Sequence, residues 1–293
     1  MCVILAGVAA EAQTPWPVPD SVHAPPGARS TLVTIQAGSP TTKPPLFCVH
    51  AEAGEVSLYF GIARHLGGEQ PLLGLCAPPE LGAHWSLEQL AARHVQSIGR
   101  ARPTGPYLIL GECTGGALAY EIAQQLRAAG QQVALLALVD SFAPGQPHLR
   151  RFMPRPLYRV AHRVRILGFH LHNLARLDVN DKFAYAAAKL ERARLKIAAR
   201  RNRPAAGASP QLSFRSALAA YTPKPWTDSM LLIRAARLPL GIQPAPDMGW
   251  GALVERLQLE TVPGYFTTPI SEPGVRILAE GLARHLASAA PSS

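Results

Sequence analysis

The sequence has few of the residues that build disulfide-rich, metal-binding or membrane-spanning proteins. Its 293 residues include four cysteines, Cys2, Cys48, Cys76 and Cys113, and none of these form the C-x-x-C spacing of a zinc site. The cysteine pattern therefore predicts no metal site and reduced thiols in place of disulfides, as in a cytoplasmic protein. No stretch reaches about 18 uninterrupted apolar residues, so we expect no contact with a membrane.

Charge is also scarce, at 16% of residues, and acidic residues are nearly missing from one segment. Positions 146–204 hold 15 Lys and Arg against three acids, whereas the rest of the chain holds 14 Lys and Arg against 16 acids. A positive charge confined to one segment argues against a protein that coats nucleic acid, and no aromatic stacking motif accompanies it. The segment either attracts an anionic ligand or forms the solvated face of amphipathic helices.

Short apolar stretches alternate with amphipathic ones along most of the chain. The apolar stretches predict strands and the amphipathic ones predict helices, an alternation typical of a mostly parallel sheet with helices on both faces. We expect strands at 31–38, 45–54, 71–78, 106–112, 132–140, 229–236 and 257–264, and helices at 55–67, 86–101, 210–222 and 274–287, with one more that ends at 130.

The alternation stops after about residue 145, where a basic, helix-favouring block begins. An α/β sheet that is interrupted by a helical block predicts a core with an inserted lid. The first residues are rich in proline and predict a linker or extended arm. The expected domains are a linker at 1–28, a core at 29–145 and 207–288, a basic helical lid at 146–206 and a tail at 289–293.

The stretch GECTG, from Gly111 to Gly115, joins an expected strand to an expected helix. It has the G-x-S-x-G layout of a nucleophile elbow, with Cys113 in the place of the serine. The glycines give the tight turn its room, and the backbone N–H of Thr114 faces any oxyanion that forms there. Because the N-terminus of a helix lowers the pKa of a thiol, the pattern predicts that Cys113 reacts as a thiolate.

Several stretches resemble the thioesterase domains of nonribosomal peptide synthetases, over about residues 30–287. They are PPLFCVH at 44–50, the run at 105–141, MGWGALVERLQLETVPG at 248–264 and the ending EP-VR-LAE-L--HL at 272–286. The resemblance implies an α/β-hydrolase fold with a doubly wound, mostly parallel sheet and an inserted helical lid. It also implies that the elbow residue takes an acyl chain from the phosphopantetheine arm of a carrier protein, with no bound cofactor.

The same resemblance implies roles for residues outside the elbow. Asp140 ends the strand after the elbow helix, where this family commonly has the acid of its catalytic triad. The loop after FCVH implies a second backbone N–H of the oxyanion hole, at Ala51 or Glu52, beside that of Thr114. His50 belongs to this loop and usually supports it, although it is also an alternative base.

The histidine base that the family has after its last strand is missing. The family stretch resembles V-P-G-D-H-F, whereas this chain reads VPGYF, with Tyr265 and Phe266 at positions where we expect contacts with the substrate. Two explanations assign no base: the domain is an inactive module that docks a carrier protein, or Cys113 works as a thiolate without a base. The third explanation is a relocated histidine, which is allowed because a triad is defined by geometry and not by chain order.

His148 is the favoured candidate for a relocated base, because it lies eight residues after Asp140 on the same expected rim. The alternatives are His50 and three histidines of the expected lid, His162, His170 and His172. The next histidine along the chain is His285, in the final expected helix, where a structural role is expected.

A thiol at the elbow favours release by an internal nucleophile. Transfer to Cys113 keeps the acyl group as a thioester, which is more reactive toward a nitrogen than an oxygen ester is. Cysteine at this place resembles family members that close four-membered rings, and the additional loss of the histidine is similar to monobactam-forming release domains such as that of sulfazecin synthesis. The resemblance therefore implies a thioesterase and cyclase that forms a strained ring, a β-lactam. The alternatives are hydrolytic release, an editing thioesterase and an inactive carrier-docking module.

The partners implied by the resemblance are an upstream peptidyl carrier domain and a peptidyl thioester substrate. The basic lid favours an anionic substrate or an acidic carrier protein, because opposite charges attract across a surface. We expect a monomeric domain, and the missing aromatic stacking motif predicts no nucleic-acid partner.

Overall fold

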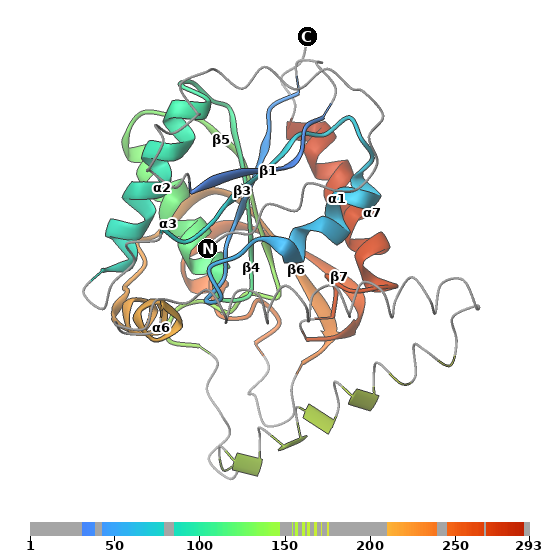
Figure 1. Ribbon diagram of the computed structural model, residues 1–293. Helices are drawn as coiled ribbons and strands as arrows, with labels where there is room; N and C mark the ends of the chain where they lie inside the picture. Colours follow the sequence, from blue (N-terminus) through green and yellow to red (C-terminus); the bar gives the residue numbers. More distant parts are fainter. Residues whose placement is uncertain are drawn as a thin grey trace, which may run out of the picture.

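The computed structural model describes residues 31–38, 43–78, 85–146, 210–238, 245–266 and 268–289, with scattered positions between 154 and 175. One seven-stranded sheet has the order β1-β3-β2-β4-β5-β6-β7 (Figure 1). Its strands are β1 (Leu32–Gln36), β2 (Leu46–Val49), β3 (Leu72–Leu75), β4 (Tyr107–Glu112), β5 (Val133–Val139), β6 (Trp226–Arg237) and β7 (Val254–Tyr265). Only the β1–β3 pair is antiparallel among them, so the predicted mostly parallel sheet is confirmed.

Helices cover both faces of the sheet, as expected for a doubly wound fold. In Figure 1, α2 and α3 lie on one side of the sheet and α1 and α7 on the other. A separate apolar core fills the space under each pair of helices. The helices are α1 (Phe60–Leu66), α2 (Leu87–Ala101), α3 (Gly115–Ala128), α6 (Pro210–Ala220) and α7 (Gly274–Ala289), with short 3-10 turns η2 (Ser57–Tyr59) and η3 (Trp250–Ala252).

The strands that carry the site are buried over their full length or nearly so. Every residue of β4 is buried, as are the last five of β5. Continuous apolar runs of this kind are typical of parallel strands that are covered on both faces. The carboxyl ends of β2, β4 and β5 therefore meet at one edge of a rigid sheet, which is where ligands bind in open α/β folds.

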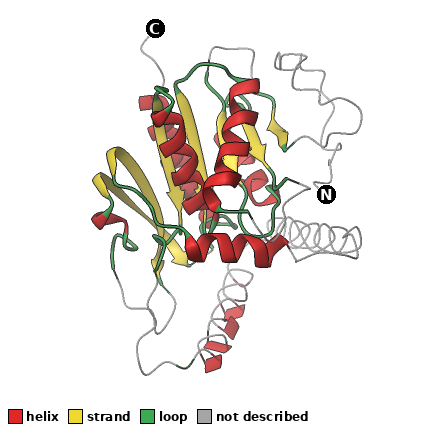
Figure 2. Cartoon of the chain, turned by 90° about the vertical axis from the view of Figure 1, so that its left-hand side faces the viewer, coloured by secondary structure: helices red, strands yellow, loops and turns green. Residues whose placement is uncertain are grey.

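Helix α2 shows how local sequence fixes an element beside this sheet. Ser86 accepts the N–H of Gln89 at 3.2 Å, and the Gln89 side chain accepts the Ser86 N–H at 3.0 Å, which completes a capping box. The buried side of the helix carries Leu87, Leu90 and Ile98. Figure 2 shows this helical layer standing in front of the sheet, with one further helix, α6, crossing its lower end.

The first strand does not pair with the strand that follows it in the chain. The stretches at 31–38 and 45–54 follow one another in the chain, yet β1 pairs with β3 and not with β2. This arrangement leaves β1 at one edge of the sheet, with β7 at the other. The expected linker at 1–28, most of the expected lid at 146–206 and the tail after residue 289 lie outside the described residues.

One expectation about the cysteines is wrong. Cys48 and Cys113 are free thiols, but Cys76 is disulfide-bonded. Sequence spacing could not reveal this bond, because a disulfide depends on how closely two cysteines approach in space. No helix of the described residues is long and apolar enough to cross a membrane.

Candidate active site

Cys113 stands at the turn between β4 and α3. Its backbone has a φ of 52°, in the left-handed region that few non-glycine residues adopt. The N–H of Cys113 donates to the carbonyl of Val139 at 2.9 Å, which ties the turn to the neighbouring strand β5. Such a strained strand-to-helix turn holds the side chain of the central residue at the edge of the sheet, as a nucleophile elbow does.

The two glycines of GECTG are required by close packing. A Cβ on Gly111 would lie 2.7 Å from the Cβ of Ala119, and a Cβ on Gly115 would lie 2.6 Å from the carbonyl oxygen of His50. Nonbonded atoms do not approach one another this closely, so neither position accepts a side chain. The glycines therefore allow α3 to begin directly beside β4 and the loop after β2.

A cavity of about 500 Å³ opens beside the Cys113 thiol. It brings together residues from the elbow, from the loop after β2, from the loop after β5, from α6 and from the segment after β7. Its lining residues are Glu52, Cys113, Thr114, Ala117, Asp140, Phe142, Ala143, Pro144, Gly145, Gln146, Arg215, Leu218, Ala219 and Phe266. Five of the residues singled out in the sequence thus share one cavity: Glu52, Cys113, Thr114, Asp140 and Phe266.

Asp140 follows the last residue of β5 and is almost completely buried. Its φ of 45° again lies in the left-handed region. The backbone N–H of Asp140 donates to the carbonyl of Ile233 at 2.9 Å, and its Oδ1 accepts the N–H of Ala235 at 2.7 Å. Two contacts with β6 therefore fix the orientation of this carboxylate in the cavity wall.

The loop after β2 reaches the elbow through Glu52. The Glu52 N–H donates to Oγ1 of Thr114 at 3.2 Å, and its carboxylate pairs with Nε of Arg215 on α6 at 3.0 Å. This N–H is therefore directed at the Thr114 hydroxyl, whereas the carbonyl of Ala51 accepts the N–H of Gly54 at 2.9 Å. The ion pair links the loop after β2 to the helix that covers the cavity.

The environment of Cys113 does not favour a thiolate. Burial raises the pKa of its thiol, and the nearby carboxylates of Glu112, Asp140 and Glu52 raise it further. A hydrogen bond from the Thr114 backbone lowers this pKa, but by less than the other groups raise it. The expected lowering of the thiol pKa by the start of α3 is therefore wrong, because desolvation and three carboxylates outweigh the helix.

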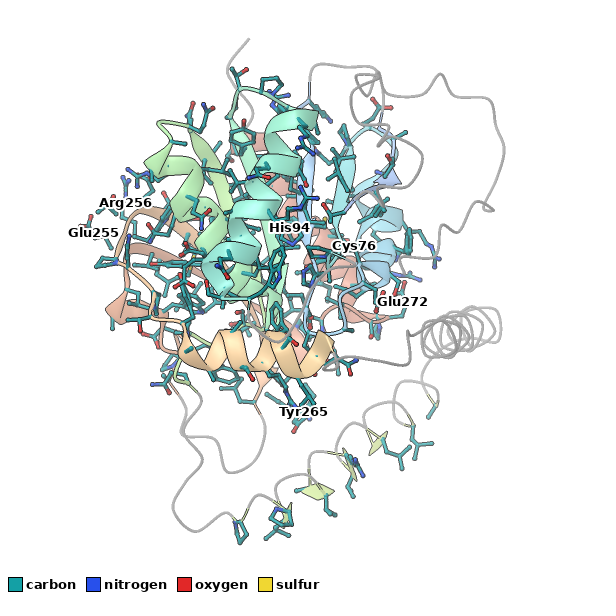
Figure 3. The ribbon with its side chains drawn as sticks, turned by 60° about the vertical axis from the view of Figure 1, so that its left-hand side comes forward. Cys76, His94, Glu255, Arg256, Tyr265 and Glu272 are labelled. Carbon is teal, nitrogen blue, oxygen red and sulfur yellow. The ribbon has the colours of Figure 1, made fainter. Side chains whose placement is uncertain are left out.

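His50 lies behind the cavity and is not among the residues that line it. It is completely buried, and its Nδ1 lies 2.7 Å from the carbonyl oxygen of Ala51. Its ring contacts those of His94 and Phe214, with centroid distances of 5.2 and 5.6 Å. Burial lowers the pKa of His50 to about 4, so it is neutral at physiological pH. Figure 3 shows His94 on α2, in the body of the molecule.

The other histidines singled out in the sequence divide into two groups. His148, His162, His170 and His172 lie outside the described residues. Gln146, which precedes His148 by two positions, does line the cavity. His285, expected to be structural, is on α7 and its Nε2 lies 2.8 Å from a carboxylate oxygen of Glu260 on β7.

Phe266 stands at the position where the sequence resemblance predicts the histidine of the family. Its N–H donates to the carbonyl of Arg237 at 2.9 Å, and its ring packs against that of Phe142 with a centroid distance of 5.4 Å. Tyr265 is buried in the core under α2 and α3 and is not among the lining residues of this cavity. Phe266 thus meets the cavity and Tyr265 does not.

Sequence reasoning missed two residues of the cavity that have distinctive chemistry. Arg215 is on the helix predicted at 210–222, where nothing distinguished it from other surface arginines. Phe142 lies two residues after Asp140, and this position on the same rim could have predicted that it lines the cavity. In the described part of the chain, no three histidine, cysteine or acidic residues are grouped so as to hold a metal ion.

Comparisons with known proteins identify the family. The model of the thioesterase domain matches residues 44–223. Malpibaldin synthetase of Mortierella alpina is 39% identical over 104 residues, which are 34% of this chain and 2% of that protein. The dimodular nonribosomal peptide synthase of Bacillus subtilis is 36% identical over 105 residues, which are 34% of this chain and 4% of that protein. The chain therefore spans only a small part of these relatives.

A solved structure agrees over a larger part of the chain. The NocB thioesterase domain, in covalent complex with a fluorophosphonate nocardicin G analog, has a TM-score of 0.59 and 25% identity, and the match covers 87% of this chain and 99% of that one. The family model covers more than half of the chain, including the elbow, Asp140 and α6. The chain belongs to the thioesterase domain family.

Proposed function

We propose that this domain releases a peptidyl chain from a nonribosomal peptide synthetase through an acyl-enzyme on Cys113. The observation that carries the proposal is the strained elbow, which presents the Cys113 thiol to a cavity that Asp140 also lines. An oxygen or sulfur nucleophile at such a turn is the arrangement of acyl-transfer enzymes. The covalent nocardicin G analog in the NocB domain supports acyl transfer on this fold.

The substrate arrives on the 4'-phosphopantetheine arm of an upstream peptidyl carrier protein, and the domain itself holds no cofactor. The relatives that match this chain are multidomain synthetases, which supports a carrier partner. The Cys113 sulfur attacks the thioester carbonyl, and the backbone N–H of Thr114 stabilises the oxyanion. A second N–H comes from the loop after β2, either that of Ala51 or that of Glu52 once it is released from the Thr114 hydroxyl. The bond between the carbonyl carbon and the pantetheine sulfur then breaks, that sulfur takes the proton that Cys113 lost, and the acyl chain remains on Cys113.

A base is needed for this step because the thiol pKa of Cys113 is raised. We assign this role to His148, oriented by Asp140. Gln146 lines the cavity two positions before His148, which supports a base on this rim. His50 is less suited, because it is buried and is not among the residues that line the cavity.

Release then occurs by attack of a nitrogen of the chain on its own thioester, which closes a strained ring, a β-lactam. The thioester on Cys113 retains the activation that a nitrogen nucleophile needs. An anionic peptidyl substrate suits Arg215 at the cavity and the basic residues of positions 146–204. The alternative functions are hydrolytic release and editing, which both give the free acid, and simple carrier docking, which gives no product.

The proposal is tested by intact-mass measurement after mixing the protein with a synthetic peptidyl thioester. We expect an adduct on the wild type and none on Cys113→Ala. His148→Ala should stall as the acyl-enzyme or fail to load, whereas His285→Ala is a matched control on α7 that should behave as the wild type. A ring product has the mass of the acid less one water. Free acid as the sole product would favour hydrolytic release or editing, and an absence of any adduct would favour carrier docking.

A further inference from the structure

The cavity beside Cys113 contains an aromatic pair that the reaction outlined above does not explain. Phe142 and Phe266 both line the cavity, with ring centroids 5.4 Å apart and ring planes inclined by 45°. Ala117, Ala143 and Leu218 extend this apolar lining. None of these side chains offers a hydrogen bond to a water molecule. Phe266 also stands where the sequence resemblance predicts a histidine.

Backbone contacts hold both rings in place. The N–H of Phe266 donates to the carbonyl of Arg237 at the end of β6, and the Phe266 side chain is only 9% exposed. Phe142 follows Ser141, whose carbonyl accepts Nε1 of the buried Trp250 at 2.8 Å. After Phe142, the N–H of Ala143 donates to the carbonyl of Met248 at 3.0 Å. The pair is therefore supported by the sheet and by the segment around η3, so that it forms a fixed wall.

A fixed apolar wall has a direct consequence for an acyl-enzyme. Hydrolysis needs a water molecule that is held by polar groups near the thioester carbonyl and is deprotonated as it attacks. An apolar surface holds such a water poorly, because the water would lose hydrogen bonds that it has in bulk solvent. A nucleophile that belongs to the acyl chain arrives with the substrate and does not depend on such a water site.

We propose that the Phe142–Phe266 pair determines whether the acyl chain on Cys113 is released by its own nitrogen or by water. This inference rests on the proposed function. In ring closure the nitrogen forms a bond to the thioester carbonyl carbon, the carbon–sulfur bond breaks, and the proton lost by the nitrogen ends on the sulfur of Cys113. In hydrolysis the oxygen of water forms the new bond, one of its protons ends on the same sulfur, and the product is the free acid. The aromatic pair favours the first route by excluding the water of the second.

The test uses a β-aminoacyl N-acetylcysteamine thioester, whose amine can close a four-membered ring, and measures the ratio of ring product to free acid by mass spectrometry. Phe142→Ala and Phe266→Ala should each lower this ratio by about tenfold or more, because they open the wall to water. Phe266→His should lower it further, because it adds a base to the cavity that Asp140 lines. Phe266→Leu keeps an apolar side chain and should stay within about twofold of the wild-type ratio.

Phe60→Ala is a matched aromatic control, since Phe60 is on α1, is 38% exposed and is remote from the cavity lining. Its ratio should equal that of the wild type. A thermal melt of each variant shows whether a change in the ratio of ring product to free acid arises from unfolding. If Phe266→Ala is unstable, Phe142→Ala still tests the role of the aromatic pair. Acylation of Cys113 with an unchanged ratio in both alanine variants would overturn the inference while the proposed function stands. A wild type that never carries an acyl group on Cys113 would overturn both.

Discussion

Oδ1 of Asp140 accepts the backbone N–H of Ala235 at 2.7 Å, which ties the acid at the end of β5 to the neighbouring strand β6. The backbone N–H of Asp140 also donates to β6, at Ile233. The carboxylate is thus oriented by the sheet itself before any substrate enters. A carboxylate that is already oriented can position a base at low entropic cost. Asp140 thus has a structural role, as a hydrogen-bond partner of β6, and a second role that depends on its charge.

Asp140→Asn should separate these two roles. The amide oxygen of Asn can still accept the Ala235 N–H, so we expect a free energy of unfolding within about 1 kcal/mol of the wild type. Turnover of a thioester substrate should fall by about 10²-fold or more, because the neutral amide does not stabilise a protonated base. Asp140→Ala should lower the free energy of unfolding by about 1–3 kcal/mol, because it leaves the Ala235 N–H buried without its acceptor. Full turnover by the asparagine variant would exclude Asp140 as the acid.

The raised pKa of Cys113 makes a second prediction, about the pH dependence of alkylation. Because burial and three carboxylates disfavour the thiolate, the rate of reaction with iodoacetamide should still be rising above about pH 9. Glu112→Gln removes the carboxylate with the largest influence on this thiol and should shift the profile to lower pH. Labelling is followed by peptide mass spectrometry, with Cys113→Ala as the blank. A plateau near neutral pH in the wild type would contradict the prediction.

The sequence was sufficient for most of the fold. The alternation of apolar and amphipathic stretches predicted the strands near the site and the helices α2, α6 and α7 close to their observed bounds. It failed to predict the pairing of β1 with β3, because local patterns do not say which strands become neighbours. The disulfide of Cys76 was not predicted either, because such a bond depends on how closely two cysteines approach in space.

For the site, the sequence pointed to two residues that line one cavity, Cys113 and Asp140, but not to the electrostatics around them. The glycines and the strand before them marked Cys113, and the end of an apolar run marked Asp140. The thiol pKa of Cys113 depends on burial and on carboxylates that the fold brings together. The start of a helix alone predicted that this pKa is lowered, whereas it is raised. The contact of Glu52 with Arg215 joins residues from a loop and from α6, and no local pattern predicts it.

Cys113→Ser provides a third prediction, about the need for sulfur. Serine fits the elbow, since its side chain is similar in size, so the variant should fold as the wild type does. Any acyl-enzyme would be an oxygen ester, which a nitrogen attacks more slowly than a thioester. We expect the rate of ring formation from a β-aminoacyl thioester to fall by about tenfold or more, as measured by product mass over time. Equal rates of ring formation would show that the thiol is not required for this step.

A fourth prediction follows from the buried pair His50 and His94. Burial lowers the pKa of His50 from 6.5 to about 4 and lowers that of His94 well below its usual value, to which His50 and Arg93 also contribute. In the unfolded chain both rings take up a proton near pH 6.5, whereas in the folded protein they remain neutral. The unfolded state therefore binds more protons below this pH, and stability is lost as the pH falls from about 6.5 toward 4.

The loss attributed to His50 reaches about 3 kcal/mol at the acid end of this range. Urea unfolding of the wild type at about pH 7.5 and about pH 5 should show it as a lower free energy of unfolding at the lower pH. His94→Leu replaces one titrating ring by an apolar side chain in the core under α2 and should make the decline with pH shallower. His285→Gln is the control, since His285 is about one-quarter exposed and pairs with Glu260. If His94→Leu loses stability with pH as steeply as the wild type, the acid sensitivity arises from other groups and not from this buried ring.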